Sequence, residues 1–430
     1  MAGHLRQDIY DRRNTLALLG ALCFFLSAIE YLIPKPLPFM RIGLANMPLL
    51  LALNILGSKD FFLLVLLKLI GQGLIGGTFL SFVFLFSIGG TFTSAAAMYA
   101  LSRLFSFGRG PGKGYLGFAG IGCAGAMVSN GVQLLLARYM VFGEAVRYIA
   151  PPFLAAGFVT GISLGIICEH FCRRSLWYTS RTGNAGPLPA ELDSDPKVGK
   201  PGVFRNEKPA KAVPREERRL RRSQRWDGLF NADELFVAGL LMALIFLHDR
   251  SLLGHFMQFL FFCLLVWFSG RKHNLLATVV FIAGIVFFNL LVPHGRVLFA
   301  LGPLEITQGS LLSGLKRATT LSGLMMLSRA CVRKDLRLPG SVGSLLAEAL
   351  RMLELMRKKI PLIRRGQVFA GIDGLMLEME TANQGGLGDI PRKKTQRSVK
   401  AVLLLGAMVV LTATIGDFAT LVFFLIAWVH

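Results

Sequence analysis

The stretch Arg41-Ile-Gly-Leu-Ala-Asn-Met-Pro48 lies where two apolar runs meet, at 15–34 and 44–57. An arginine and an asparagine at membrane depth need partners, because an unpaired polar group in hydrocarbon is costly. The stretch therefore indicates a polar site inside a membrane protein. The alternative is that Arg41 reaches the lipid headgroups and Asn46 caps the next helix, and this stretch alone does not separate the two interpretations.

The rest of the chain predicts an all-α polytopic membrane protein. Of its 430 residues, 53% are hydrophobic and only 17% are charged, a balance typical of that class. The N-terminal half contains six apolar runs of spanning or near-spanning length, at 15–34, 44–57, 60–80, 82–104, 116–141 and 149–172. The second run is short and contains Pro and Gly, as expected where a helix is broken or re-entrant and lines a cavity.

Changes in composition divide the chain into three parts. Residues 1–172 are expected to form one membrane domain, 173–227 a basic cytoplasmic linker, and 228–430 a second membrane domain. The apolar runs of the second domain lie near 229–247, 252–269, 274–292, 307–328 and 401–429. The last of these is long enough for one long helix or two short ones.

A polar segment of the second domain contains an amphipathic pattern. Between 342 and 360, apolar residues recur at helical spacing opposite a charged face that includes Arg351 and Arg357. Such a helix lies along the membrane surface, docks a cytoplasmic partner or packs against the rest of the polar segment. The pattern does not choose among the three.

The formal net charge of +22 does not predict nucleic-acid binding, because the basic residues lie between the apolar runs, as in cytoplasmic loops. The linker run Arg215-Glu-Glu-Arg-Arg-Leu-Arg-Arg222 is expected to contact anionic lipid headgroups. The pair in Cys168-Glu-His-Phe-Cys172 lacks a second pair of ligands, so no metal site is predicted.

Polar residues inside the apolar runs are the candidates for a binding site. They are Glu30, Arg41, Asn46, Lys68, Gln72, Thr78, Asn130, Gln133 and Arg138. Lys68 and Gln72 share one helix face, and Asn130 and Gln133 nearly do. If these faces converge, they form a pocket for a ligand that bears phosphate or a polar heterocycle. The alternative is a structural ion pair between Lys68 and Glu30.

Three segments carry a family resemblance. Arg41–Pro48, Lys68 through Gly76-Gly-Thr-Phe79, and Ser129-Asn-Gly-Val-Gln133 resemble the Gx transporter family, also labelled heptaprenyl diphosphate synthase component I, over most of 15–172. That family looks like the six-helix S components of energy-coupling-factor (ECF) vitamin transporters. Its RnfT-type members are implicated in moving flavins across the cytoplasmic (inner) membrane, for ApbE-type transferases that flavinylate extracytosolic proteins. Where the family has a His before the Asn of the third motif, this chain has Ser129.

The second half is similar, more weakly, to ECF T components. The similarity runs from Ile306-Thr-Gln-Gly-Ser310 to Ser328-Arg-Ala330. It implies an S-like module fused to a T-like module, with Arg329, Arg351 and Arg357 as candidates for coupling to a partner. The implied partners are ECF-type ATPases or ApbE/Rnf-type redox machinery. The Ala-Arg-Gly-like motif through which T components touch their ATPases has no clear copy here.

The resemblance implies a flavin transporter in which FAD or FMN is the transported ligand and no cofactor or metal is tightly bound. No catalytic residue is assigned, and the expected substrate-binding residues are Arg41, Asn46, Lys68, Gln72, Thr78, Asn130 and Gln133. Vitamin uptake with a separate ATPase, prenyl diphosphate synthesis and a scaffold role in a redox complex are the alternatives. Prenyl diphosphate synthesis needs Asp-rich Mg²⁺ clusters, and the chain contains no Asp-Asp-x-x-Asp.

Overall fold

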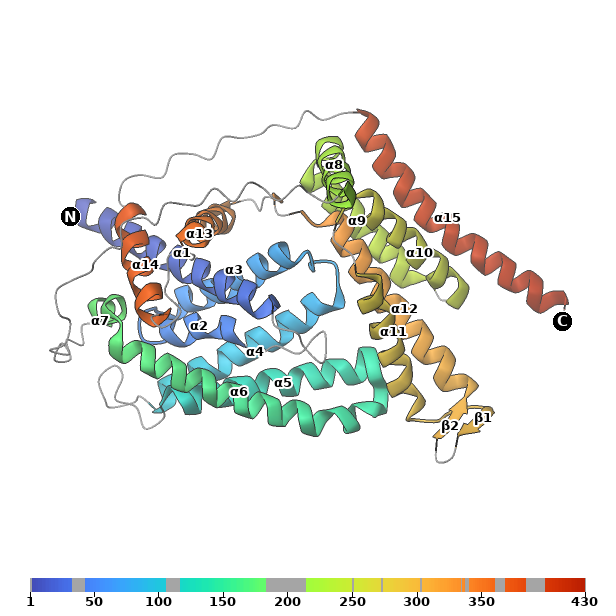
Figure 1. Cartoon of the computed structure of the whole chain (residues 1–430), viewed down its shortest axis with the longest axis horizontal. Coiled ribbons are helices and arrows are strands. Elements are labelled where there is room, and N and C mark those ends of the chain that lie inside the picture. The colour runs from blue at the N-terminus through green and yellow to red at the C-terminus, as the bar shows by residue number, and fades with distance from the viewer. Residues whose placement is uncertain are drawn as a thin grey trace.

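The computed structural model confirms an all-α polytopic membrane protein. It describes residues 2–32, 43–105, 117–182, 214–249, 251–271, 274–301, 304–333, 335–336, 340–359, 368–383 and 399–429. Figure 1 shows two groups of helices side by side, with the two ends of the chain on opposite sides of the molecule. We call them the N-terminal bundle (α1 to α7) and the C-terminal bundle (α8 to α12 with α15).

The N-terminal bundle forms from the six apolar runs expected in this half. Its elements are α1 (Ala2–Leu32), η1 (Leu44–Asn46), α2 (Met47–Ala52), α3 (Ser58–Gly76), α4 (Phe82–Phe105), α5 (Phe118–Ala137), η2 (Arg138–Phe142), η3 (Gly143–Ala145), α6 (Val146–Arg174) and α7 (Leu176–Thr182). Helix α2 has only six residues. The second run is therefore short, as its Pro and Gly content predicts.

The second half contributes a second bundle, a hairpin and two further helices. Its elements are α8 (Pro214–Leu229), α9 (Ala232–His248), α10 (Leu252–Phe268), α11 (Leu275–Leu290), β1 (Val297–Leu301), β2 (Leu304–Thr307), α12 (Gln308–Cys331), α13 (Gly340–Lys359), α14 (Val368–Asn383) and α15 (Val399–Val429). Strands β1 and β2 pair antiparallel with an irregularity between Val297 and Phe299. The last apolar run is one continuous helix of 31 residues, α15.

Within the described residues, four ranges are long and apolar enough to cross a membrane. They are Asp11–Glu30, Phe82–Phe105, Phe118–Arg174 and Val399–Asp417, and the bent pair α8 and α9 adds a fifth candidate. The range Phe118–Arg174 has 57 residues, which is too long for one crossing of a hydrocarbon layer about 30 Å thick. It contains the reversal at η2 and η3, so α5 and α6 lie side by side (Figure 1).

Helices α13 and α14 follow the C-terminal bundle in the sequence but pack on the N-terminal bundle (Figure 1). Leu345, Leu346 and Ala349 of α13 belong to the same buried cluster as Leu16 and Leu19 of α1. The amphipathic pattern at 342–360 thus belongs to a helix whose apolar face is covered by the chain itself. Of the three interpretations the sequence left open, the structure favours packing. Helix α13 packs chiefly on α1, and Met376 and Met379 of α14, in the same polar segment, belong to the same buried cluster.

The two bundles also meet directly. A buried cluster joins Phe82 and Phe86 of α4 to Phe281 of α11 and Leu321 of α12, and the rings of Phe82 and Phe281 are stacked with centroids 5.8 Å apart. Buried aromatic pairs of this kind are worth about 0.5–1.5 kcal/mol beyond their area. The bundles therefore share a core in addition to a chain connection.

Candidate functional site

A buried lysine forms the centre of the candidate site. Lys68, in the middle of α3, is 2% exposed, and its Nζ donates a hydrogen bond to Oδ1 of Asn46. A cation in such a place requires polar partners, because desolvating it is costly. The structure therefore joins two of the predicted site residues that are 22 positions apart in the sequence.

The turn before α2 positions Asn46. Gly43 has φ 90°, a left-handed conformation that glycine adopts without steric cost. The Asn46 N–H donates to Gly43 O over 2.7 Å, which closes the 3₁₀ turn, and Pro48 follows in the first turn of α2. Asn46 occupies the N-cap position, but its side chain makes no capping hydrogen bond. Its amide serves Lys68 instead.

Arg41, the first residue of the opening stretch, lies outside the described residues.

Gln72 lies one turn after Lys68 on α3 and is 9% exposed. These two side chains therefore share the face of α3 that the i, i+4 spacing predicts.

Thr78 lies in the turn that ends α3. Gly77 terminates the helix in the left-handed conformation (φ 60°), and the Thr78 N–H donates to Gly73 O over 2.9 Å. Ser328 of α12 then binds this turn. Its Oγ donates to Gly77 O over 2.7 Å and accepts from the Leu80 N–H at 3.1 Å. The C-terminal bundle thus holds the Gly76-Gly-Thr-Phe79 motif, which sequence reasoning did not foresee.

Asn130 and Gln133 of α5 face two different helices. Asn130 Nδ2 donates to Phe153 O of α6 over 3.0 Å. Gln133 Nε2 donates to Ser129 Oγ over 3.1 Å, at the place where α4 approaches through Gly90. Asn130 and Gln133 thus contact α4, α5 and α6, whereas Lys68 of α3 contacts Asn46 at the start of α2. The predicted residues thus fall into two groups.

The seam between α4 and α5 contains two buried polar atoms with unused hydrogen-bonding capacity. Gln133 Oε1 and Ser94 Oγ are buried without a hydrogen-bond partner among the described residues. Ser94 lies one turn after Gly90 on α4 and faces Gly125 of α5. Unsatisfied buried acceptors are uncommon in native proteins and call for an explanation. Ser94 was not predicted, because a serine in an apolar run usually bonds to its own helix.

The three arginines proposed for coupling lie on two helices. Arg329 follows Ser328 on α12, is half-buried, and has its Nη2 3.9 Å from Met325 Sδ. Arg351 is half-buried and Arg357 exposed on α13. Arg329 therefore lies next to the contact between the bundles. In the described part of the chain, no cluster of three or more His, Cys, Asp or Glu side chains could hold a metal ion.

Comparisons with known families cover two parts of the chain. The family described as Heptaprenyl diphosphate synthase component I matches residues 19–171. A family described as Domain of unknown function (DUF8519) matches residues 235–334. No curated protein and no solved structure matches the chain. The first match spans α1 to α6 and includes all seven predicted binding residues, so these residues lie in the part of the chain with a known family similarity.

Proposed function

We propose that this protein moves a flavin, FMN or FAD, across the cytoplasmic membrane. The observation that carries the proposal is the buried Lys68–Asn46 pair inside a bundle of apolar helices. A buried lysine can exchange an amide partner for a phosphate oxygen, which forms the stronger, charge-assisted hydrogen bond. The family match over 19–171 supports a ligand-binding role of the S-component type.

The remaining polar residues have complementary roles in this proposal. Gln72 lies on the same helix face as Lys68 and would bind the ribityl chain or a second phosphate oxygen. The amide of Gln133 and the hydroxyl of Ser94 have unused acceptor capacity, which suits the N–H of a flavin ring. Asn46 and Asn130 would complete the hydrogen bonding to the ligand. These assignments require the two groups of residues to bind different parts of one long ligand.

The C-terminal bundle supplies the scaffold and the coupling in this proposal. Ser328 binds both sides of Thr78 through backbone groups, so a movement of α12 changes the end of α3, the helix that carries Lys68. Asn289 of α11 makes a second link, with its Nδ2 3.2 Å from Val141 O. Arg317 steadies Asn289 by donating to its Oδ1 over 3.2 Å.

The test is flavin binding by the purified full chain. Lys68→Ala is expected to weaken FMN binding about tenfold or more, because a hydrogen bond to a charged group is worth about 1.5–3 kcal/mol. Lys59→Ala removes an exposed lysine from the same helix and is expected to leave binding unchanged. Asn46→Ala is likewise expected to weaken binding. Its control is Asn54→Ala, which should leave binding unchanged because Asn54 donates a hydrogen bond to Tyr178 Oη instead. Unchanged binding in both Lys68→Ala and Asn46→Ala would refute the site.

The name of the matched family favours a second candidate, a component of a prenyl diphosphate synthase. The chain lacks an Asp-Asp-x-x-Asp sequence, the feature expected to hold the Mg²⁺ ions of that reaction. The same preparation, incubated with farnesyl and isopentenyl diphosphate and Mg²⁺, is expected to form no product. Product formation that Lys68→Ala abolishes would favour the enzyme. Flavin uptake that depends on a co-purifying ATPase would instead indicate ECF-type import.

A further inference from the structure

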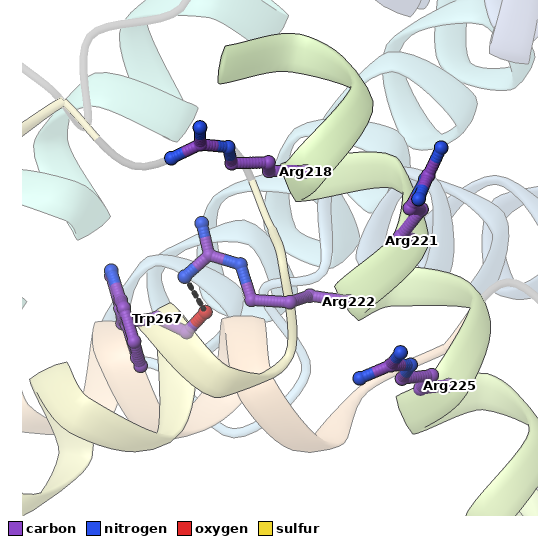
Figure 2. Close-up of a pocket in the computed structure, with 5 residues that line it drawn as sticks. All are labelled: Arg218, Arg221, Arg222, Arg225 and Trp267. Carbon is purple, nitrogen blue, oxygen red and sulfur yellow. Dashed lines mark hydrogen bonds between the residues drawn. The ribbon is translucent and has the colours of Figure 1, made fainter. Parts of the chain in front are cut away.

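Helix α8 presents four arginines to a pocket on the surface of the C-terminal bundle. Arg218, Arg221, Arg222 and Arg225 recur at i, i+3, i+4 and i+7, and with Trp267 of α10 they line a pocket of about 540 Å³. Figure 2 shows Arg218 and Arg222 extending from α8 toward Trp267, with Arg221 turned to the far side. The pocket thus combines four cations with one aromatic face.

The flank of α8 that carries Arg219, Ser223 and Trp226 fixes the helix in place. Trp226 is 6% exposed, and Phe230, just after the helix, is 1% exposed. The backbone of α8 also comes close to Gly270, where an added Cβ would lie 2.6 Å from Arg219 O and from Ser223 N. Gly270 has φ 66°, so both the turn and the close approach require glycine. The pocket is therefore a built feature of the fold.

Carboxylates do not neutralise the four arginines. Among the described residues, none of the four forms an ion pair. Two of the three acidic residues on α8 face other groups, since Glu216 pairs with Arg219 and Asp227 faces Arg271 and Arg333. The third, Glu217, is exposed and forms no ion pair among the described residues. Arg222 lies over the Trp267 ring, 4.4 Å from its centroid, and donates from Nη1 to Trp267 O over 3.2 Å. These contacts orient a guanidinium without cancelling its charge.

The helices around the pocket have the arrangement expected at a membrane surface. Helix α8 meets α9 at 94°, and α9 and α10 expose apolar side chains such as Leu244 (58%) and Leu264 (55%), as lipid-facing helices do. A helix perpendicular to such spans lies along the interface. Trp267, 58% exposed at the end of α10, occupies the position that interfacial tryptophans prefer. Phosphate groups of lipids are therefore the nearest abundant anions.

We propose that the pocket of Arg218, Arg221, Arg222, Arg225 and Trp267 binds the phosphate of an anionic phospholipid headgroup. The planar guanidinium of Arg222, held on the indole, offers its remaining N–H groups to one phosphate oxygen, while Arg218 and Arg225 bind the others and Arg221 adds positive charge at the rim. The acyl chains then lie against the exposed apolar face of α10. The site is distinct from the flavin site, and its test does not depend on flavin binding.

The experiment measures binding of short-chain phosphatidylglycerol to the full chain in neutral detergent. The double variant Arg218→Gln/Arg222→Gln is expected to bind about 25-fold more weakly, because each basic residue near a lipid phosphate contributes about fivefold. The matched control is Arg103→Gln/Arg147→Gln, which also removes two arginines that lie over tyrosine rings, 5.0 and 4.8 Å from the centroids. It is expected to change binding less than twofold.

Further arms identify the source of the phosphate and exclude misfolding. Inorganic phosphate and short-chain phosphatidylcholine are titrated in parallel, and both are expected to bind far more weakly than phosphatidylglycerol. Phosphate binding as tight as the lipid's would overturn the lipid assignment, and equal losses in the two double variants would overturn the pocket. Arg218→Gln alone changes an exposed side chain and preserves the fold, so an undiminished affinity in this variant also counts against the proposal.

Discussion

Helices α8 and α13 both carry arginines along a face, but they lie on different surfaces of the molecule. On α13, Leu345, Ala349 and Met352 are at most 4% exposed and pack on the N-terminal bundle. On α8, Leu220 and Leu229 are 49% and 52% exposed. A continuous apolar stripe docks a helix on another helix, because buried apolar area supplies the driving force. Helix α8 lacks such a continuous stripe, and its charged face stays exposed.

Helices α13 and α8 also differ in whether their charged side chains have partners of opposite charge. Arg13 of α1 lies 3.0 Å from Glu348 of α13, so the docked helix meets an opposite charge on its partner. The exposed arginines of α8 have no carboxylate partner among the described residues. The comparison teaches that the apolar residues of a basic helix decide its position. Those of α13 form a stripe that packs on the N-terminal bundle, whereas α8 has no such stripe and leaves its arginines exposed. The three predictions below test the docking of α13, the cap that α14 provides for α7, and the anchor of α8.

The largest expected effect comes from breaking the docking of α13. Ala349 is fully buried, and an atom added at Gly20 of α1 would lie 3.4 Å from its Cβ. Ala349→Arg forces a charge into this contact and is expected to destabilise it by about 3 kcal/mol or more. Limited proteolysis should then cut the segment containing α13 faster. Ser341→Arg adds the same side chain at an exposed position of the same helix and should behave as the wild type; equal cleavage of both variants would contradict the docking.

An intermediate effect is expected at α14, which holds α7. Asp373 is 7% exposed and accepts hydrogen bonds from Ser175 Oγ, from the Leu176 N–H at 2.9 Å and from the Trp177 N–H at 3.1 Å. It thus caps the first turn of α7 from another helix. Asp373→Asn is expected to cost about 1–3 kcal/mol, measured as a lower melting temperature. Asp11→Asn, in a half-exposed position on α1, is the control; a smaller loss for Asp373→Asn than for Asp11→Asn would count against the cap.

The smallest effect concerns the anchor of α8. Arg333 Nη1 donates to Asp227 O over 2.9 Å and to Phe230 O over 2.8 Å, and its Nε and Nη2 donate to Asp335. Burial alone raises the pKa of Asp335, but the hydrogen bonds and charge of Arg333 outweigh it, so the pKa is lowered from its ordinary 3.8. The stabilisation of the folded state by the Asp335–Arg333 pair is therefore complete above pH 3.8. It is lost as the pH falls through the pKa that Asp335 has in the folded protein.

Because Asp335 is largely exposed, its contribution is expected to stay below about 1 kcal/mol. Asp335→Asn should lower the melting temperature slightly at neutral pH, and the difference from the wild type should vanish in acid. The measurement is a pair of melting curves at neutral and acidic pH. A difference that persists in acid would contradict the role of this carboxylate and would leave the position of α8 to its apolar contacts alone.

The candidate site was partly predictable from local patterns. The spacing of Lys68 and Gln72 predicted a shared helix face, and the Gly and Pro around Asn46 predicted a turn between apolar runs. The same reasoning placed Asn130 and Gln133 nearly on one face, because residues three apart lie about 60° from each other round a helix. In the structure this angle is enough for Asn130 to contact α6 and for Gln133 to lie against α4. Ser94 and Ser328 gave no signal, because a hydroxyl in an apolar run has no distinctive pattern.

The sequence by itself determined the helical class, the short second helix and the amphipathic face of α13. These follow from hydropathy, from Pro and Gly, and from the helical period, which act within a few residues of each other. Only the tertiary structure decided that α13 covers α1, that Ser328 holds the turn at Thr78 and that Trp267 lies beside Arg222. Each of these contacts joins residues far apart in the chain. Shape and packing select such partners, and a local pattern does not record them.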